Sequence, residues 1–142
     1  KEKGMKRFIL PILFISLSTL LFASNKDDEK NEGKPEILFE ATNYDFGYIK
    51  ESKGLVSCTF EFENTGTAPL LIIEATANCG CTKPTFPVKP IKPGKKGKIK
   101  VSYNPAHRPG GFRKAIKVKT NCKKKVHTLY IEGSVIPVEE EK

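Results

Sequence analysis

The chain has 142 residues, of which 25 are Lys or Arg and 16 are Asp or Glu, so its formal net charge at pH 7 is +9. This length predicts a single domain whose core is large enough to fold without a metal or a disulfide. The positive balance favours anionic partners or surfaces but excludes no fold. The sequence has no Gly-rich phosphate loop and no Ser-His-Asp arrangement, so it predicts a protein that is not an enzyme.

The N-terminus has the three parts of a secretory signal. Met5, Lys6 and Arg7 form a short positive start, residues 8–22 are mostly apolar, and Ala23 offers a small residue for cleavage. This pattern predicts a signal peptide over residues 1–24, cleaved near Ala23, and an exported protein of the periplasm or the extracellular space. Residues 1–4 precede the only Met and are interpreted as an upstream extension. The alternative is a retained membrane anchor, for which the apolar run is short.

A charged segment separates this signal from the rest of the chain. Residues 25–35 combine charged residues with Gly and Pro and have no apolar periodicity, which predicts a solvated tether. The folded domain is expected over residues 36–137, followed by a tail at 138–142. Within the domain the apolar residues alternate with period two, which is typical of β-strands.

Seven extended segments are predicted, at residues 37–46, 56–64, 69–77, 84–93, 98–103, 112–120 and 128–135. The third is apolar on both faces at residues 70–73, which predicts a central strand. The fourth has Pro at every third position and is therefore expected at a sheet edge. The other strands have one apolar face, which a second layer must cover. We therefore predict an all-β, immunoglobulin-like antiparallel β-sandwich of about seven strands, with a small barrel as the alternative.

Several motifs resemble a bacterial exported family, known as domain of unknown function 1573. They are Phe60-Glu61-Phe62-Glu63-Asn64-Thr65-Gly66, Asn78-Cys79-Gly80-Cys81-Thr82 and Ile91-Lys92-Pro93-Gly94. The resemblance covers about residues 39–135, and the Cys-Gly-Cys-Thr element is its most specific part. It implies an exported protein with an immunoglobulin-like fold, related in shape to modules of ciliary and centrosomal scaffolds. It implies no established activity.

Antiparallel strands would sort the loops into two ends. One end would gather residues 47–54, 79–81 and 104–111, and the other would gather residues 64–68, 92–97 and 121–125. The two histidines, His107 and His127, would then lie at opposite ends and could not pair. Cys58 would lie toward the first end and Cys122 toward the second, so a partner for Cys58 would be Cys79 or Cys81.

The first end holds the Cys79-Gly80-Cys81 loop, which supports three interpretations. The two thiols can be a structural bend, buried or joined to stabilise the loop. They can be redox-active, with His107 or Arg108 lowering a thiol pKa. Cys79, Cys81 and His107 can also bind a soft metal such as copper or zinc. Export makes some disulfide expected, but four cysteines allow several pairings and the sequence does not choose among them.

The second end is rich in lysine and forms a candidate anion-binding surface. Its residues are Lys92, Lys95, Lys96, Lys123, Lys124 and Lys125. They could bind an anionic polysaccharide, lipid headgroups or an acidic protein. Nucleic acid is not expected, because no exposed aromatic residues are interleaved with the lysines. The alternative is a solvated face that has no partner.

These observations predict an exported, non-catalytic binding or scaffold module of the cell envelope, with no small-molecule substrate and no required cofactor. The alternative is a thiol-redox or soft-metal protein that acts through Cys79 and Cys81. A third hypothesis is a subunit that adds a strand from a partner protein to an exposed sheet edge.

Overall fold

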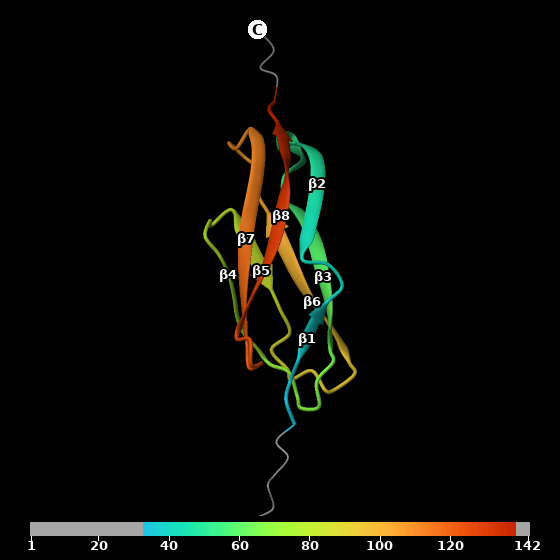
Figure 1. The fold of residues 1–142 in the computed structure, drawn as a ribbon. Coiled ribbons are helices and arrows are strands. Elements are labelled where there is room, and N and C mark those ends of the chain that lie inside the picture. Colours follow the sequence, from blue (N-terminus) through green and yellow to red (C-terminus); the bar gives the residue numbers. More distant parts are fainter. Residues whose placement is uncertain (1–32, 139–142) are drawn as a thin grey trace, which may run out of the picture. The chain divides into compact units, whose positions relative to one another are not determined.

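The domain is a sandwich of two four-stranded sheets (Figure 1). A computed structural model describes residues 33–138, so the predicted signal peptide and residues 25–32 of the predicted tether lie outside the described residues. One sheet has the order β1 (Ile37–Phe39), β3 (Val56–Asn64), β6 (Lys96–Tyr103) and β5 (Thr82–Thr85). The other has the order β2 (Asn43–Lys50), β8 (Val126–Ile136), β7 (Gly110–Thr120) and β4 (Ile72–Ala77), and a 3-10 turn at Glu51–Lys53 follows β2. The predicted immunoglobulin-like sandwich is confirmed, with eight strands.

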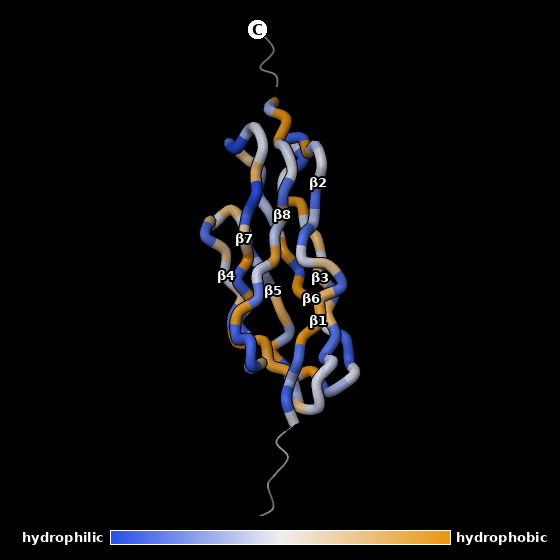
Figure 2. The backbone as a smooth tube through the Cα atoms, in the orientation of Figure 1, coloured by the Kyte–Doolittle hydropathy of each residue, from blue (hydrophilic) through white to orange (hydrophobic). Residues whose placement is uncertain are grey.

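The core forms between the sheets because apolar side chains alternate along the inner strands. In β3, Val56, Cys58, Phe60 and Phe62 are buried, and the residues between them face outward. The strands β6, β7 and β8 repeat this pattern, and Figure 2 shows the corresponding changes between hydrophobic and hydrophilic residues along the chain. Gly97 lies opposite Phe62 in the ladder, and a Cβ at this position would collide with the Phe62 ring. The glycine therefore makes room for the Phe62 ring.

The first predicted segment is two strands rather than one. β1 pairs antiparallel with β3 in one sheet, and the chain then crosses to the other sheet, where β2 pairs parallel with β8. The sandwich therefore contains one parallel pair among its antiparallel ones. Each of the two strands covers only half of its sheet's edge, since β1 is paired with residues 62–64 of β3 and β2 is paired with β8 from Tyr130 onward.

The expectation of a central strand at residues 69–77 is wrong. β4 is an edge strand that pairs only with β7. The apolar run alternates after all, because Leu70 and Ile72 are buried whereas Ile73 is 54% exposed. Leu70 lies before the start of β4 and forms an isolated antiparallel bridge with Ile91. Of the predicted Pro-rich segment at 84–93, only Pro84 and Thr85 belong to a strand, and this strand, β5, is the edge of the opposite sheet, as expected.

The loops gather at two ends as expected. At one end, which we call the thiol end, the His107 N–H donates to Glu51 Oε1 at 2.6 Å, and the Asn104 N–H donates to the Cys81 carbonyl at 2.8 Å. At the other end, the lysine end, the Asn64 N–H donates to the Lys95 carbonyl at 3.0 Å. The chain enters the domain beside β1 at the lysine end and leaves it after β8 at the thiol end (Figure 1).

The buried side chain of Asn64 generates the first prediction. Its Nδ2 donates to the carbonyls of Ala68 and Ile91, both at 2.8 Å, and its Oδ1 accepts from the Gly66 N–H at 3.0 Å. We expect Asn64→Ala to lower the free energy of unfolding by about 3 kcal/mol, because buried main-chain groups lose their partner. Urea denaturation measures this change.

The matched control is Asn43→Ala, because the Asn43 amide is exposed and bonds only the Glu132 carboxylate. We expect it to cost less than about 1 kcal/mol. Equal costs for the two variants would contradict the assignment of Asn64 as a structural hub.

Candidate functional site

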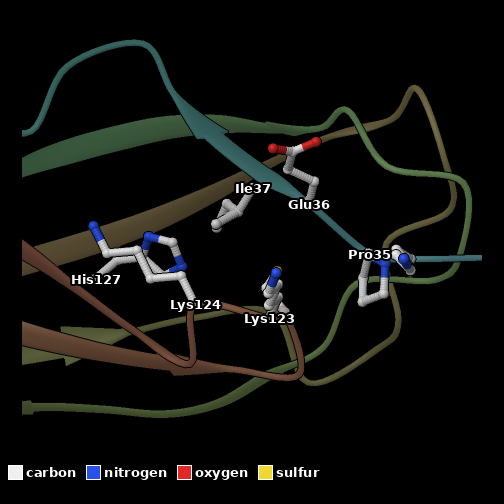
Figure 3. A pocket seen from close by; sticks show the side chains of 8 residues that line it. Pro35, Glu36, Ile37, Lys123, Lys124 and His127 are labelled. Carbon is white, nitrogen blue, oxygen red and sulfur yellow. The ribbon is translucent and has the colours of Figure 1, made fainter.

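An open cleft of about 720 Å³ lies at the lysine end of the described domain. It lies between the segment that leads into β1 and the hairpin that joins β7 to β8 (Figure 3). Figure 3 shows Pro35, Glu36 and Ile37 on the first side, facing Lys123, Lys124 and His127 on the second. Lys34 and Cys122 complete the lining. Most of the charged groups around the cleft are therefore positive.

In the structure the six predicted lysines lie on loops or strand ends at this end of the sandwich, and all six are exposed. Lys96 is the one that forms an ion pair within residues 33–138, with Glu40 at 2.6 Å, and this hydrogen bond raises the pKa of Lys96. The other five have no acidic partner among the described residues. Lys123 and Lys124 line the cleft, whereas Lys92 and Lys95 lie on the neighbouring turn before β6.

Lys34 is a member of this cluster that the sequence did not reveal, because residues 25–35 are predicted to be a solvated tether. The Lys34 N–H donates to Thr67 Oγ1 at 3.0 Å, and the Thr67 N–H donates to the Lys34 carbonyl at 2.8 Å. These two bonds attach the segment to the turn after β3. Contacts with the domain therefore begin before the expected boundary at residue 36, and they place another cation at the cleft.

His127 is the second residue that the sequence did not single out as part of a site. Its ring lies 6.0 Å from the ring of Phe39, between the two sheets, and its Nε2 is buried with no hydrogen-bond partner among the described residues. Burial lowers the pKa of His127, because the charged imidazolium loses water. The side chain therefore contributes a neutral, half-buried wall to the cleft.

The thiol end is organised by a disulfide between Cys79 and Cys81, whose Cα atoms are 5.1 Å apart. Cys81 is buried and Cys79 is half-buried. The Cys81 N–H donates to Cys79 Sγ at 3.1 Å, so the bend is also held by its main chain. A disulfide is typical of proteins outside the reducing cytosol and points to a non-cytoplasmic protein.

The predicted partners of these cysteines do not assemble a reactive site in the structure. The His107 side chain is 98% exposed and lies 3.8 Å from Glu51 Oε1, while Arg108 Nη1 donates to the Ala106 carbonyl at 2.6 Å. Within the described part of the chain, no group of three or more His, Cys, Asp or Glu residues could hold a metal ion. The arrangement therefore supports a structural bend more directly than it supports a metal centre.

Cys58 and Cys122 are free and buried, so the pairing considered for Cys58 does not occur. Cys58 lies in the core on β3, where burial raises its pKa to about 11. At neutral pH it is a protonated thiol with almost no nucleophilic thiolate. Cys122 is at the opposite end, as expected, and lines the cleft.

Thiol reactivity tests this arrangement. We expect no thiol to react with an alkylating reagent in the native protein, because both free cysteines are buried and Cys58 is protonated. Two thiols should react after denaturation and four after denaturation with reductant, as counted by intact mass. Four reactive thiols without reductant would contradict the disulfide.

The pH dependence of stability tests His127. Its pKa is lower in the fold than in the unfolded chain, where it is near its ordinary value of about 6.5, so protons bind preferentially to the unfolded state. We expect the free energy of unfolding to fall as the pH is lowered from about 7 to about 5. In His127→Gln this part of the pH dependence should disappear. An unchanged slope in the variant would assign the effect to other groups.

Comparisons with solved structures find the same fold in other bacterial proteins. A protein of unknown function from Porphyromonas gingivalis W83 matches with a TM-score of 0.61 and 18% identity, over 72% of this chain and 47% of that one. The VesB protease of Vibrio cholerae matches with a TM-score of 0.53 and 11% identity, over 72% of this chain and 31% of that one. The E. coli chaperone DraB matches with a TM-score of 0.50 and 13% identity, over 76% of this chain and 58% of that one.

At these identities the similarities establish the fold alone, and the chain spans about half or less of the first two structures. No curated protein matches the chain. Among the described residues, no helix has the length and apolar character needed to cross a bilayer. The family model described as "Protein of unknown function (DUF1573)" matches residues 37–135, which is nearly all of the described sandwich. The chain therefore belongs to this family, as its Cys-Gly-Cys-Thr and Pro-Gly motifs indicated.

Proposed function

We propose that this protein is an exported, non-catalytic binding module of the cell envelope, and that its lysine end binds an anionic surface or polymer. The observation that carries the proposal is the set of exposed lysines at the lysine end, of which Lys123 and Lys124 line the cleft. Five of the six predicted lysines have no acidic partner among residues 33–138. Lys34 adds to them from the opposite side of the cleft.

The chemistry of lysine favours an extended anionic surface over a shaped pocket. An ammonium group is a flexible point charge, whereas a specific phosphate or carboxylate site usually uses the planar fork of Arg. No Arg lines the cleft. Each Lys close to an anionic membrane surface contributes about 1 kcal/mol of attraction. Several lysines together give useful affinity without precise geometry, which suits lipid headgroups, an acidic polysaccharide or an acidic protein face.

Thiol-disulfide exchange at Cys79–Cys81 is the second candidate function. It is favoured by the disulfide itself, next to an exposed Gly80. Attack by a partner thiolate would reach Cys79, the more exposed sulfur, and would leave the Cys81 thiolate in a buried position. Burial without a positive partner disfavours a thiolate. We therefore place this function behind anion binding.

A charge-reversal variant tests the proposal. We expect Lys123→Glu/Lys124→Glu/Lys125→Glu to weaken binding to vesicles of phosphatidylglycerol and phosphatidylcholine by about a hundredfold at low salt, because at least about 3 kcal/mol of attraction is lost. Alginate, a soluble acidic polysaccharide, serves as the second probe. Co-sedimentation and its salt dependence measure the effect on each.

The matched control carries the same change in net charge on strands away from the cleft. Lys83→Glu/Lys100→Glu/Lys117→Glu alters exposed lysines of β5, β6 and β7. We expect a loss of less than about tenfold, which reflects net charge alone. Equal losses in the two triple variants would show that the overall charge is sufficient and would overturn the assignment to the lysine end.

A further inference from the structure

The half of β3 that lies toward the thiol end forms an uncovered edge of its sheet. β1 covers β3 only at residues 62–64, and the Glu40 N–H donates to the Glu61 carbonyl just beyond that stretch. Main-chain groups point alternately to the two sides of a strand. Those of Ser57 and Thr59 therefore point in the same direction as those of Glu61, away from β6. No hydrogen-bond partner for these edge groups occurs among the described residues.

This edge lacks the features that protect the other edges from strand pairing. Charged side chains, Pro, bulges and short length normally block such pairing. β1 has three residues, β2 and β4 contain register shifts, and β5 contains Lys83 and Pro84. The uncovered part of β8 directly follows three lysines. Residues 55–60, Leu-Val-Ser-Cys-Thr-Phe, have neither charge nor proline.

A groove with both polar and apolar walls runs beside the open edge. It separates β2 from the start of β3 and is lined by Tyr44, Phe46 and Leu55 among others. Tyr44 and Phe46 pack edge to face with ring centroids 4.9 Å apart. Leu55 is 71% exposed and Tyr44 is 41% exposed. The edge therefore combines exposed apolar side chains with unpaired main-chain groups. An added strand would cover both.

We propose that the open edge of β3 pairs with the same edge of a second copy of this chain. An antiparallel pairing about a two-fold axis at Cys58 places Ser57 of each copy opposite Thr59 of the other. These are the residues whose main-chain groups are unpaired, so each pair exchanges both of its hydrogen bonds. The two four-stranded sheets become one continuous sheet, and the grooves beside the two edges are brought together.

The lack of charge along the edge favours a second copy of the chain as the occupant. The paired stretch is uncharged, so no like charges face one another across the axis. Beyond the paired stretch the edge of β3 is already covered, because β1 is paired with residues 62–64 and the Glu40 N–H donates to the Glu61 carbonyl. The contact is therefore limited to residues 57–59 of each copy. A two-fold contact is self-complementary because the same patch serves both partners.

Analytical ultracentrifugation of the full-length chain tests the pairing. We expect a concentration-dependent dimer, weak because the contact is small. In Ser57→Lys/Thr59→Lys, like charges face one another across the axis, and the dissociation constant should rise about tenfold or more. In Ser57→Lys/Thr59→Glu, each Lys faces a Glu of the other copy, and the dimer should be at least as stable as that of the unmodified chain.

Ser57→Lys/Thr59→Glu is the matched control for Ser57→Lys/Thr59→Lys, because both variants replace the same two exposed residues. Circular dichroism verifies that each variant remains folded. Ile73→Lys, which places one charge at the exposed edge strand β4, is the control and should leave the dimer unchanged. Three results would overturn the proposal. They are a chain that stays monomeric up to about 1 mM, equal weakening in the two double variants, and loss of the dimer in Ile73→Lys.

Discussion

The geometry of the lysine end depends on one buried amide, that of Asn64. The side chain is completely buried and bonds Gly66 and Ala68 in the turn that follows it, and Ile91 in the segment before β6. Its Oδ1 also accepts from the Glu36 N–H at 3.4 Å, which attaches the segment that leads into β1. A buried amide with several partners fixes distant segments relative to one another, because leaving any partner unpaired is costly. One wall of the cleft, the segment that leads into β1, is positioned by these bonds rather than by the lysines themselves.

Period-two patterns predict which residues lie inside but not which sheet a strand joins. The alternation in β3, β6, β7 and β8 identifies their buried faces, because each strand stays in one sheet and has one solvated side. The segment at 37–46 bends at Glu40 and Thr42, where it crosses from one sheet to the other, but its sequence pattern does not indicate this crossing. The status of β4 as an edge strand depends on its neighbours, which a single sequence does not show. Its four apolar residues at 70–73 are therefore misleading.

The candidate site was predictable to the extent that it depends on loops between antiparallel strands. Such loops alternate between the two ends, and this places Lys92, Lys95 and Lys123 at the same end. Lys34 and His127 were not predictable as members of the site. Lys34 is held at the cleft by hydrogen bonds with Thr67, and no local sequence pattern predicts these bonds. His127 looks like an ordinary strand residue, and its burial depends on Phe39, which is far away in the sequence.

The crossing between β1 and β2 links the two surfaces that we propose. Because each strand covers half of one edge, the opposite halves stay open. The open half at β8 borders the cleft at the lysine end, and the open half at β3 lies toward the thiol end. An antiparallel pairing at β3 reverses the long axis of the second copy, so the two lysine ends of a dimer point in opposite directions. Such a dimer cannot place both lysine ends on one flat surface. It can connect two anionic surfaces or two strands of a polymer, which is the geometry of a cross-linking module.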